Sequence, residues 1–161
     1  MEKKLEVTRI FNASIEEVWK LWTAPEYIIQ WWGPDRFICP FANIDFRVGG
    51  TSLVGMQAPK EFGGQTHYNI WEYTKIVYLE RIEFIMNFAD KEGNRKNPID
   101  VGMPEDFPHD IQTVVTFKVI NPNETEMTVT ENANFGQMTY FAKLGLEQSL
   151  DKARLIFVTE K

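Results

Sequence analysis

The last part of the chain, residues 137–160, has the clearest hydrophobic pattern of the sequence. Apolar and small residues recur there at the 3.6-residue spacing of an α-helix, and charged residues fall on the opposite side. The apolar side consists of Met138, Phe141, Ala142, Gly145, Leu146, Ser149, Ala153, Ile156 and Phe157. Because the middle of this side is made of small residues, the helix either packs very close to its neighbour or leaves room beside it.

The residues before this helix predict mostly strands and turns. Apolar and polar residues alternate over residues 5–11, which indicates a first strand. Further strands are predicted over residues 37–46, 51–57, 66–75, 80–89, 111–120 and 125–131. Since most of these strands follow one another without a helix between them, we expect an antiparallel sheet. The terminal helix is the one predicted element long enough for such a sheet to bend around.

Two short helices are predicted after the first strand. Ser14 with Glu17 three residues later forms a capping box at the start of the first helix, and Thr23 with Glu26 repeats the spacing at the start of the second. The second helix is predicted to reach Trp31, which is followed by Trp32. Because adjacent helical positions point about 100° apart, we expect one of these two tryptophans to line a cavity mouth or a contact surface.

Composition narrows the class of protein. The 161 residues suit one domain with a sizeable core, and 43% hydrophobic content excludes global disorder. A net charge of −6 without a basic stripe argues against nucleic acid as a partner, and no apolar run is long enough to span a membrane. The single cysteine, Cys39, excludes an intramolecular disulfide and fits a reducing compartment. The N-terminus lacks the apolar core of a signal peptide, so we expect a cytoplasmic protein.

No catalytic or metal-binding motif stands out. The spacings of His67, His109 and Cys39 match no metal site, and no base neighbours Cys39 in the sequence. We therefore expect no metal and no cofactor, and we assign no catalytic residue.

Seven short motifs recur in one known group of proteins: FNASIEEVW (residues 11–19), PE (25–26), WWGP (31–34), DFRVGG (45–50), DKEGN (90–94), MPEDFP (103–108) and GLEQSLDK (145–152). With the order of elements, they resemble the START or Bet v 1-like superfamily (SRPBCC). Within it, the chain is similar to stand-alone bacterial proteins related to the C-terminal domain of the heat-shock protein 90 ATPase activator. The resemblance implies a single α+β helix-grip domain over residues 1–161, in which a curved antiparallel sheet, two short helices and a long C-terminal helix enclose an apolar cavity.

Residues from four parts of the chain are expected to bind a ligand in that cavity. The strands contribute Phe84, Met86, Phe88, Val115, Phe117, Met127, Val129 and Glu131. The terminal helix contributes Met138, Phe141, Ala142 and Gly145, the second short helix Trp31, and residues 90–110 Met103 and Phe107. For each apolar residue singly, the alternative is ordinary core.

Glu131 is the most consequential member of this set. It continues the inward alternation of Met127 and Val129, so it faces either the cavity or, at the strand end, solvent. In a cavity its pKa would be raised and it could act as an acid or a base.

The segment 90–110 is long, charged and rich in proline, yet it holds four large apolar residues: Ile99, Val101, Met103 and Phe107. We predict that part of it folds over one end of the sheet and covers the cavity mouth, with Met103 and Phe107 pointing inward. The alternative is a disordered insertion.

Three functions remain open. The first is non-catalytic binding of a small apolar, aromatic or lipid-like ligand, which should require a closed cavity of about 300 Å³ or more. The second, implied by the resemblance, is a protein-interaction or co-chaperone module, with a filled core and an exposed apolar patch. The third is a cyclase or hydrolase of aromatic compounds, with a carboxylate or histidine in the cavity and a partner within hydrogen-bond range.

Overall fold

The computed structural model describes residues 4–158. Strand β1 (Leu5–Phe11) is followed by helices α1 (Ile15–Thr23) and α2 (Pro25–Trp31). The strands β2 (Ala42–Asn43), β3 (Thr51–Gln57), β4 (Thr66–Val77), β5 (Arg81–Ala89), β6 (Arg95–Lys96), β7 (Ile111–Asn121) and β8 (Glu124–Asn132) come next. Short 3-10 turns η1 (Lys60–Phe62), η2 (Pro98–Val101) and η3 (Gly136–Met138) interrupt the later part, and helix α3 (Thr139–Leu155) ends the fold.

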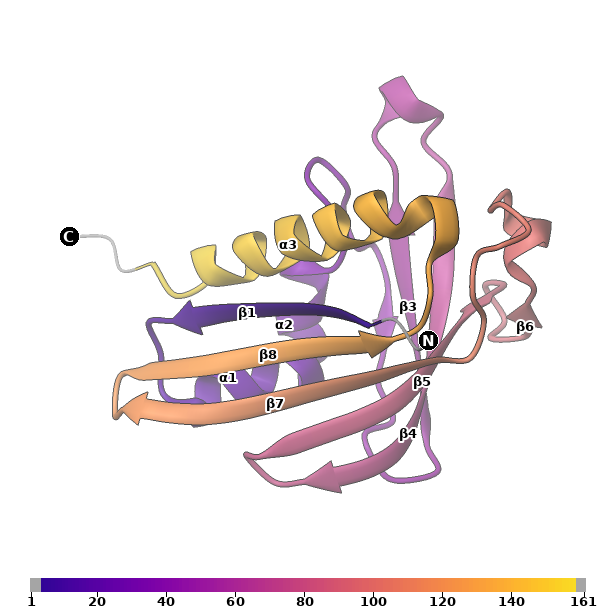
Figure 1. Ribbon diagram of the computed structural model, residues 1–161. Helices are drawn as coiled ribbons and strands as arrows, with labels where there is room; N and C mark the ends of the chain where they lie inside the picture. Colours follow the sequence, from indigo (N-terminus) through magenta and orange to yellow (C-terminus); the bar gives the residue numbers. More distant parts are fainter. Residues whose placement is uncertain (1–3, 159–161) are drawn as a thin grey trace.

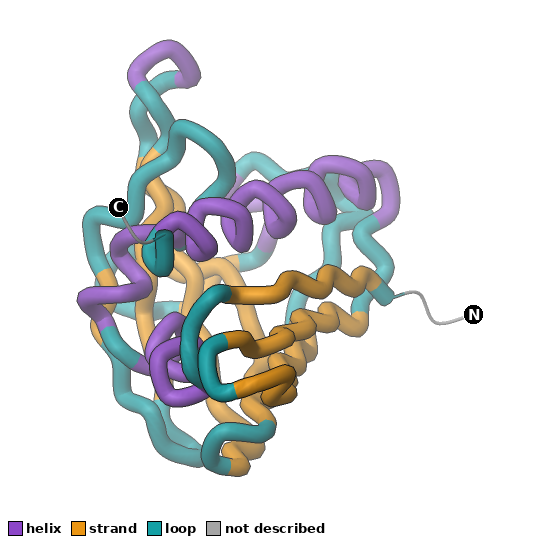
Figure 2. Tube along the Cα trace, turned by 90° about the vertical axis from the view of Figure 1, so that its left-hand side faces the viewer, coloured by secondary structure: helices purple, strands orange, loops and turns teal. Residues whose placement is uncertain are grey.

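The strands form one antiparallel sheet in the order β1-β8-β7-β5-β4-β3-β2, with β6 added to β5. In Figure 1, α3 lies along β1 and β8, while β3 and β4 turn upward behind it. Figure 2 shows the same molecule from the side, with the strands curving beneath α3. This is the α+β helix-grip fold that the sequence predicted, with its long C-terminal helix and two short helices.

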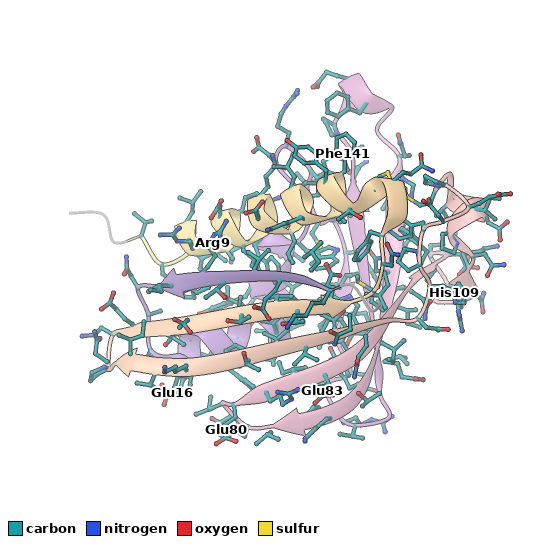
Figure 3. The ribbon with its side chains drawn as sticks, in the orientation of Figure 1. Arg9, Glu16, Glu80, Glu83, His109 and Phe141 are labelled. Carbon is teal, nitrogen blue, oxygen red and sulfur yellow. The ribbon has the colours of Figure 1, made fainter. Side chains whose placement is uncertain are left out.

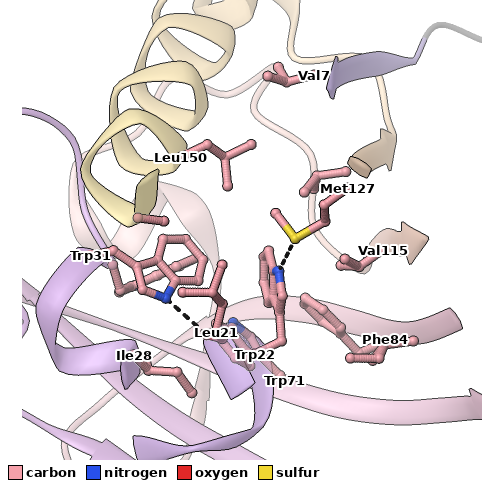
Figure 4. Packing of buried hydrophobic residues seen from close by; sticks show 14 of the residues in the cluster. Val7, Leu21, Trp22, Ile28, Trp31, Trp71, Phe84, Val115, Met127 and Leu150 are labelled. Carbon is pink, nitrogen blue, oxygen red and sulfur yellow. Dashed lines mark hydrogen bonds between the residues drawn. The ribbon is translucent and has the colours of Figure 1, made fainter. Parts of the chain in front are cut away.

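Tryptophan side chains pack over one half of the sheet's inner face. Trp22 of α1 contacts Trp71 and Phe84, with ring centroids 5.6 and 5.9 Å away, and its Nε1 donates to the sulfur of Met127 at 3.1 Å. Trp31 of α2 is fully buried, and its Nε1 donates to the Leu21 carbonyl oxygen at 2.9 Å. Figure 4 shows this cluster beside the C-terminal half of α3. This end of the fold is therefore solid core.

Local signals placed the first helix correctly and the second only in part. The Ser14 hydroxyl accepts a hydrogen bond from the Glu17 backbone N–H, which is one half of the predicted capping box, while the Glu17 carboxylate accepts from Tyr27 and pairs with Lys20. The predicted cap at Thr23 is wrong: Ala24 is the N-cap, and the Thr23 hydroxyl instead donates to the Trp19 carbonyl oxygen. The second helix does end at Trp31, as predicted.

The strand predicted over residues 37–46 is mostly wrong. Only Ala42–Asn43 pairs as a strand, together with an isolated bridge between Ile38 and Gln57. Pro40 lies between these two short pairings and has no N–H to donate, which explains why the ladder is broken there.

Of Trp31 and Trp32, it is Trp32 that lines a pocket, as expected for one of the pair, although both side chains point into the protein. Trp31 is fully buried and Trp32 is 8% exposed. The helical argument does not apply, because α2 ends at Trp31 and Trp32 has an extended backbone. The Trp32 side chain can therefore point into the protein next to Trp31.

Helix α3 is attached to the sheet mainly by its C-terminal half. Its buried residues, Ser149, Leu150 and Ala153, all lie in that half. On the outside, Arg9 of β1 donates from Nε to the Asp151 carboxylate at 2.8 Å. The predicted helix extended to residue 160, but α3 ends at Leu155, and Ile156 and Phe157 form a turn, while residues 159–161 lie outside the described part of the chain.

Candidate functional site

A pocket of about 520 Å³ lies between the N-terminal half of α3 and the sheet, and it is open to solvent on one side. Figure 3 labels Phe141 of α3 and His109 of the loop before β7, which belong to its lining. Its aromatic walls are Trp32, Phe37, Phe62, Phe88, Phe107, Phe135 and Phe141, and its methionines are Met56, Met86, Met103 and Met138. The pocket is thus mostly apolar, with adaptable methionines among rigid rings.

The small residues of α3 face the turn that follows α2. A Cβ added at Gly145 would lie 3.8 Å from Pro34 Cβ, which is ordinary contact, so alanine would fit there. The half-buried Lys152 ammonium donates to the carbonyl oxygens of Pro34 and Phe37 at 3.2 and 3.0 Å, and this partial burial lowers its pKa. These bonds hold the turn against α3, so it forms a fixed wall of the pocket.

Residues 98–109, here called the mouth loop, fold over one end of the pocket. The Phe107 ring packs between Phe88 and Phe135, with centroids 5.6 and 5.5 Å away. The Asp106 carboxylate accepts hydrogen bonds from the backbone N–H and the side-chain amide of Gln137, at 3.0 and 3.2 Å. Met103 also lines the pocket. The loop is therefore an ordered wall, with Met103 and Phe107 inward as predicted.

Glu131 lies inside the pocket, not in solvent. It is 7% exposed and pairs across the sheet with Leu5 of β1 and Thr113 of β7. Among residues 4–158, none donates a hydrogen bond to its carboxylate; the Thr113 hydroxyl donates instead to the Ile111 carbonyl oxygen. Burial without a partner raises the pKa of Glu131 to about 7.

Other polar groups stand at the rim. The side-chain amide of Asn87 donates to the Asp110 carboxylate at 3.1 Å and accepts from the Asp110 backbone N–H at 2.7 Å. Asp110 also pairs with Arg95 at 2.8 Å and His109 at 3.1 Å, and the hydrogen bond from Asn87 is the main reason that its pKa is lowered. The polar groups at the rim are therefore hydrogen-bonded to one another, whereas the Glu131 carboxylate has no such partner among the described residues.

Metal and thiol chemistry find little support in the site. Within the described residues there is no group of three or more His, Cys, Asp or Glu side chains that could hold a metal ion. Cys39 is buried, its thiol donates to the Phe41 carbonyl oxygen at 3.3 Å, and burial raises its pKa. A raised pKa leaves less of the reactive thiolate.

The structure divides the predicted ligand-binding residues into two groups. The pocket lining includes Met86, Phe88, Met103, Phe107, Glu131, Met138, Phe141, Ala142 and Gly145. The others lie outside this lining and are buried in the solid core: Trp31, Phe84, Val115, Phe117, Met127 and Val129. The reason is that α1 and α2 insert their tryptophans over this half of the sheet, so that Trp19, for example, packs 5.0 Å from Phe117.

The predicted set of ligand-binding residues named Trp31 where Trp32 lines the pocket, and it did not include the turn after α2 or the β3–β4 hairpin. Met56, Phe62 and His67 of this hairpin region line the pocket although they lie far from α3 in the sequence. They reach it because the sheet curls, which no local pattern reveals. Arg36 lies over the Phe62 ring, 5.4 Å from its centroid, and forms an ion pair with Glu61, so the hairpin tip is tied to the turn.

Comparison with protein families matches residues 12–155 to the family described as Activator of Hsp90 ATPase homolog 1-like protein. The chain belongs to this family. Its family and fold fit a ligand-binding or co-chaperone-like protein of the SRPBCC superfamily. A search of curated proteins found no match. None of the helices in residues 4–158 is long and apolar enough to cross a membrane.

Solved structures of bacterial proteins share the fold. Protein Ms6760 from Mycobacterium smegmatis is 19% identical with a TM-score of 0.76, covering 100% of this chain and 98% of that one. Protein CV1439 from Chromobacterium violaceum is 23% identical with a TM-score of 0.76, covering 98% of both chains. A protein from Arthrobacter aurescens is 21% identical with a TM-score of 0.78, covering 96% of this chain and 85% of that one.

Proposed function

We propose that this protein binds a small apolar ligand, aromatic or lipid-like, without covalent chemistry, in the pocket between α3 and the sheet. The observation that carries the proposal is the pocket itself, about 520 Å³ with aromatic and methionine walls. That volume falls in the range of about 300–1,000 Å³ typical of small-molecule sites. The pocket is open on one side, not closed as expected, because the N-terminal half of α3 stands off the sheet.

The site favours binding over catalysis. General acid–base catalysis needs groups that exchange protons with the substrate and whose pKa values are adjusted by neighbouring groups. Glu131 is the one carboxylate in the lining, and no described side chain lies within hydrogen-bond range to serve as its partner. A cyclase or hydrolase of aromatic compounds is therefore the weaker reading.

Two variants of one helix position test the proposal. Gly145→Leu places a large side chain beside Pro34 and into the pocket, whereas Gly145→Ala fits at ordinary contact distance. The neutral aromatic dye N-phenyl-1-naphthylamine serves as the probe, and its fluorescence reports binding. We expect Gly145→Leu to weaken binding about tenfold or more, and Gly145→Ala to leave it unchanged.

Circular dichroism of both variants would show that the fold is retained. Equal dye affinity for the parent and Gly145→Leu would place the binding site elsewhere and refute the proposal. Native mass spectrometry of the protein purified from the cytoplasm, where we expect it to reside, would show whether a ligand copurifies.

A protein-interaction module of the co-chaperone kind is a second candidate, suggested by the family description. Exposed aromatic side chains on and beside the pocket rim favour it: Phe62 is 58%, Phe141 60% and Tyr140 69% exposed. The test is the ATPase rate of an Hsp90-type chaperone with and without the protein. A rate increase that Phe141→Ser abolishes would support this candidate over simple ligand binding.

A further inference from the structure

We propose that the ligand is a hydrophobic amine in its protonated form, and that the Glu131 carboxylate pairs with its ammonium group. This inference rests on the proposed ligand binding and names the chemical class of the ligand. It follows from three features of the same pocket: an unpartnered buried carboxylate, a lining without lysine or arginine, and walls of aromatic rings.

The first feature is the position of Glu131. A carboxylate kept for structural reasons is normally paired, because burying an unpaired charge costs several kcal/mol. Its neighbours across the sheet, Leu5 and Thr113, do not supply a partner. Its carboxylate oxygens nevertheless remain accessible from the pocket. The indole nitrogens of Trp32 and Trp71, in contrast, are inaccessible and have no hydrogen-bond partner among the described residues. The carboxylate therefore borders the open space of the pocket, where a bound molecule can reach it.

The second feature is the charge of the lining. Of the described residues that line the pocket, none is lysine or arginine. Lys152 lies nearby, but its ammonium is occupied by the carbonyl oxygens of Pro34 and Phe37. Of the two lining histidines, His109 is mostly exposed and pairs with Asp110, whereas His67 is partly buried beside the Phe88 ring. A carboxylic acid would therefore bring a second negative charge near Glu131 with no lysine or arginine in the lining to offset it.

The third feature is the aromatic wall. An ammonium group is attracted to the faces of tryptophan and phenylalanine rings, and the attraction is strongest where water is excluded. Trp32, Phe88, Phe107 and Phe135 all line the pocket. The same rings accommodate the apolar part of a ligand. An amine with an aromatic or alkyl body therefore satisfies both the carboxylate and the walls.

The raised pKa of Glu131 agrees with this assignment. Among residues 4–158 none donates to this carboxylate to stabilise its charge, and burial raises its pKa to about 7. An ammonium at hydrogen-bond distance would supply that stabilisation. A neutral alcohol could also donate to the carboxylate but would not offset its charge, so the expected order of affinity is amine, then alcohol, then carboxylic acid.

The experiment compares three ligands with one ring system: 1-naphthylmethylamine, 1-naphthalenemethanol and 1-naphthoic acid. Isothermal titration calorimetry at pH 8 measures each against the parent, Glu131→Gln and Glu126→Gln. Glu126 lies on the same strand with its side chain on the other face of the sheet, so its variant controls for the loss of one negative charge. We expect the parent to bind the amine about tenfold or more tightly than the alcohol, with the acid weakest.

Glu131→Gln should lose the preference for the amine over the alcohol, whereas Glu126→Gln should match the parent. Equal affinity of the parent for amine and alcohol, or tighter binding of the acid, would overturn the inference whether or not the variants fold. In that outcome the proposed function would survive, because the pocket would still bind. If neither these ligands nor N-phenyl-1-naphthylamine bound, the proposed function would fail together with the inference.

Discussion

Replacing Glu131 with glutamine should stabilise the protein at alkaline pH and leave its stability almost unchanged near pH 4. Glutamine has nearly the same shape as glutamic acid and carries no charge at any pH. The buried carboxyl has a pKa of about 7 in the folded protein, against an ordinary value of 4.5, because burial disfavours its charged form. The folded state therefore holds this proton more tightly than the unfolded state does.

The sign and size of the effect follow from this difference. Below about pH 4.5 the carboxyl is protonated in both states and costs little. As the pH rises toward 7, the unfolded chain releases the proton first, so the stability of the parent falls, and above pH 7 the loss is complete. At about 1.4 kcal/mol for each pH unit between the two pKa values, the total loss is about 3 kcal/mol.

Urea unfolding followed by tryptophan fluorescence, at several pH values from 4 to 9, measures this directly. The buried tryptophans around Trp22 report loss of the core. His67 and His109, the other titratable side chains in the lining apart from Glu131, are present in parent and variant alike and cancel in the difference. Glu126→Gln is the control for the loss of one charge. If the difference between parent and Glu131→Gln were flat across this pH range, Glu131 would not be the unpartnered buried group described above.

Three further predictions concern other parts of the molecule. Met127→Ala should lower the free energy of unfolding by about 2–5 kcal/mol in urea titrations without altering dye affinity, because Met127 packs against Trp22 in the core. Met86→Ala, in the pocket, should instead alter dye affinity with little effect on the free energy of unfolding. Asp106→Ala should speed amide hydrogen exchange in the mouth loop by removing two hydrogen bonds from Gln137, and an unchanged rate would contradict this. Gly145→Ala should raise the free energy of unfolding by about 1 kcal/mol through helix propensity, as thermal unfolding can show.

Much of the fold could be predicted because its signals are local. The helical spacing before residue 156, the alternation in β1 and the Ser14 cap each depend on neighbours a few residues away, and each is present in the structure. The inward direction of Glu131 was also a local prediction, since alternate residues of a strand share one face. Sequence alone left open whether that face meets solvent or a pocket at the strand end.

Tertiary structure decided which inward residues line the pocket. Phe84 and Met86 are two positions apart on β5 and share a face, yet Phe84 stacks on Trp71 in the core and Met86 borders the pocket. The difference arises from where α1 and α2 place their tryptophans.

The same holds for Trp31 and Trp32, whose directions depend on where α2 ends, and for Phe62, which the curl of the sheet brings to the pocket. The sequence by itself determined most of the elements and which residues of the regular strands face inward, because periodicity and capping are local. The tertiary structure alone decided where the interior is filled and where it is open, because that depends on contacts between segments far apart in the chain.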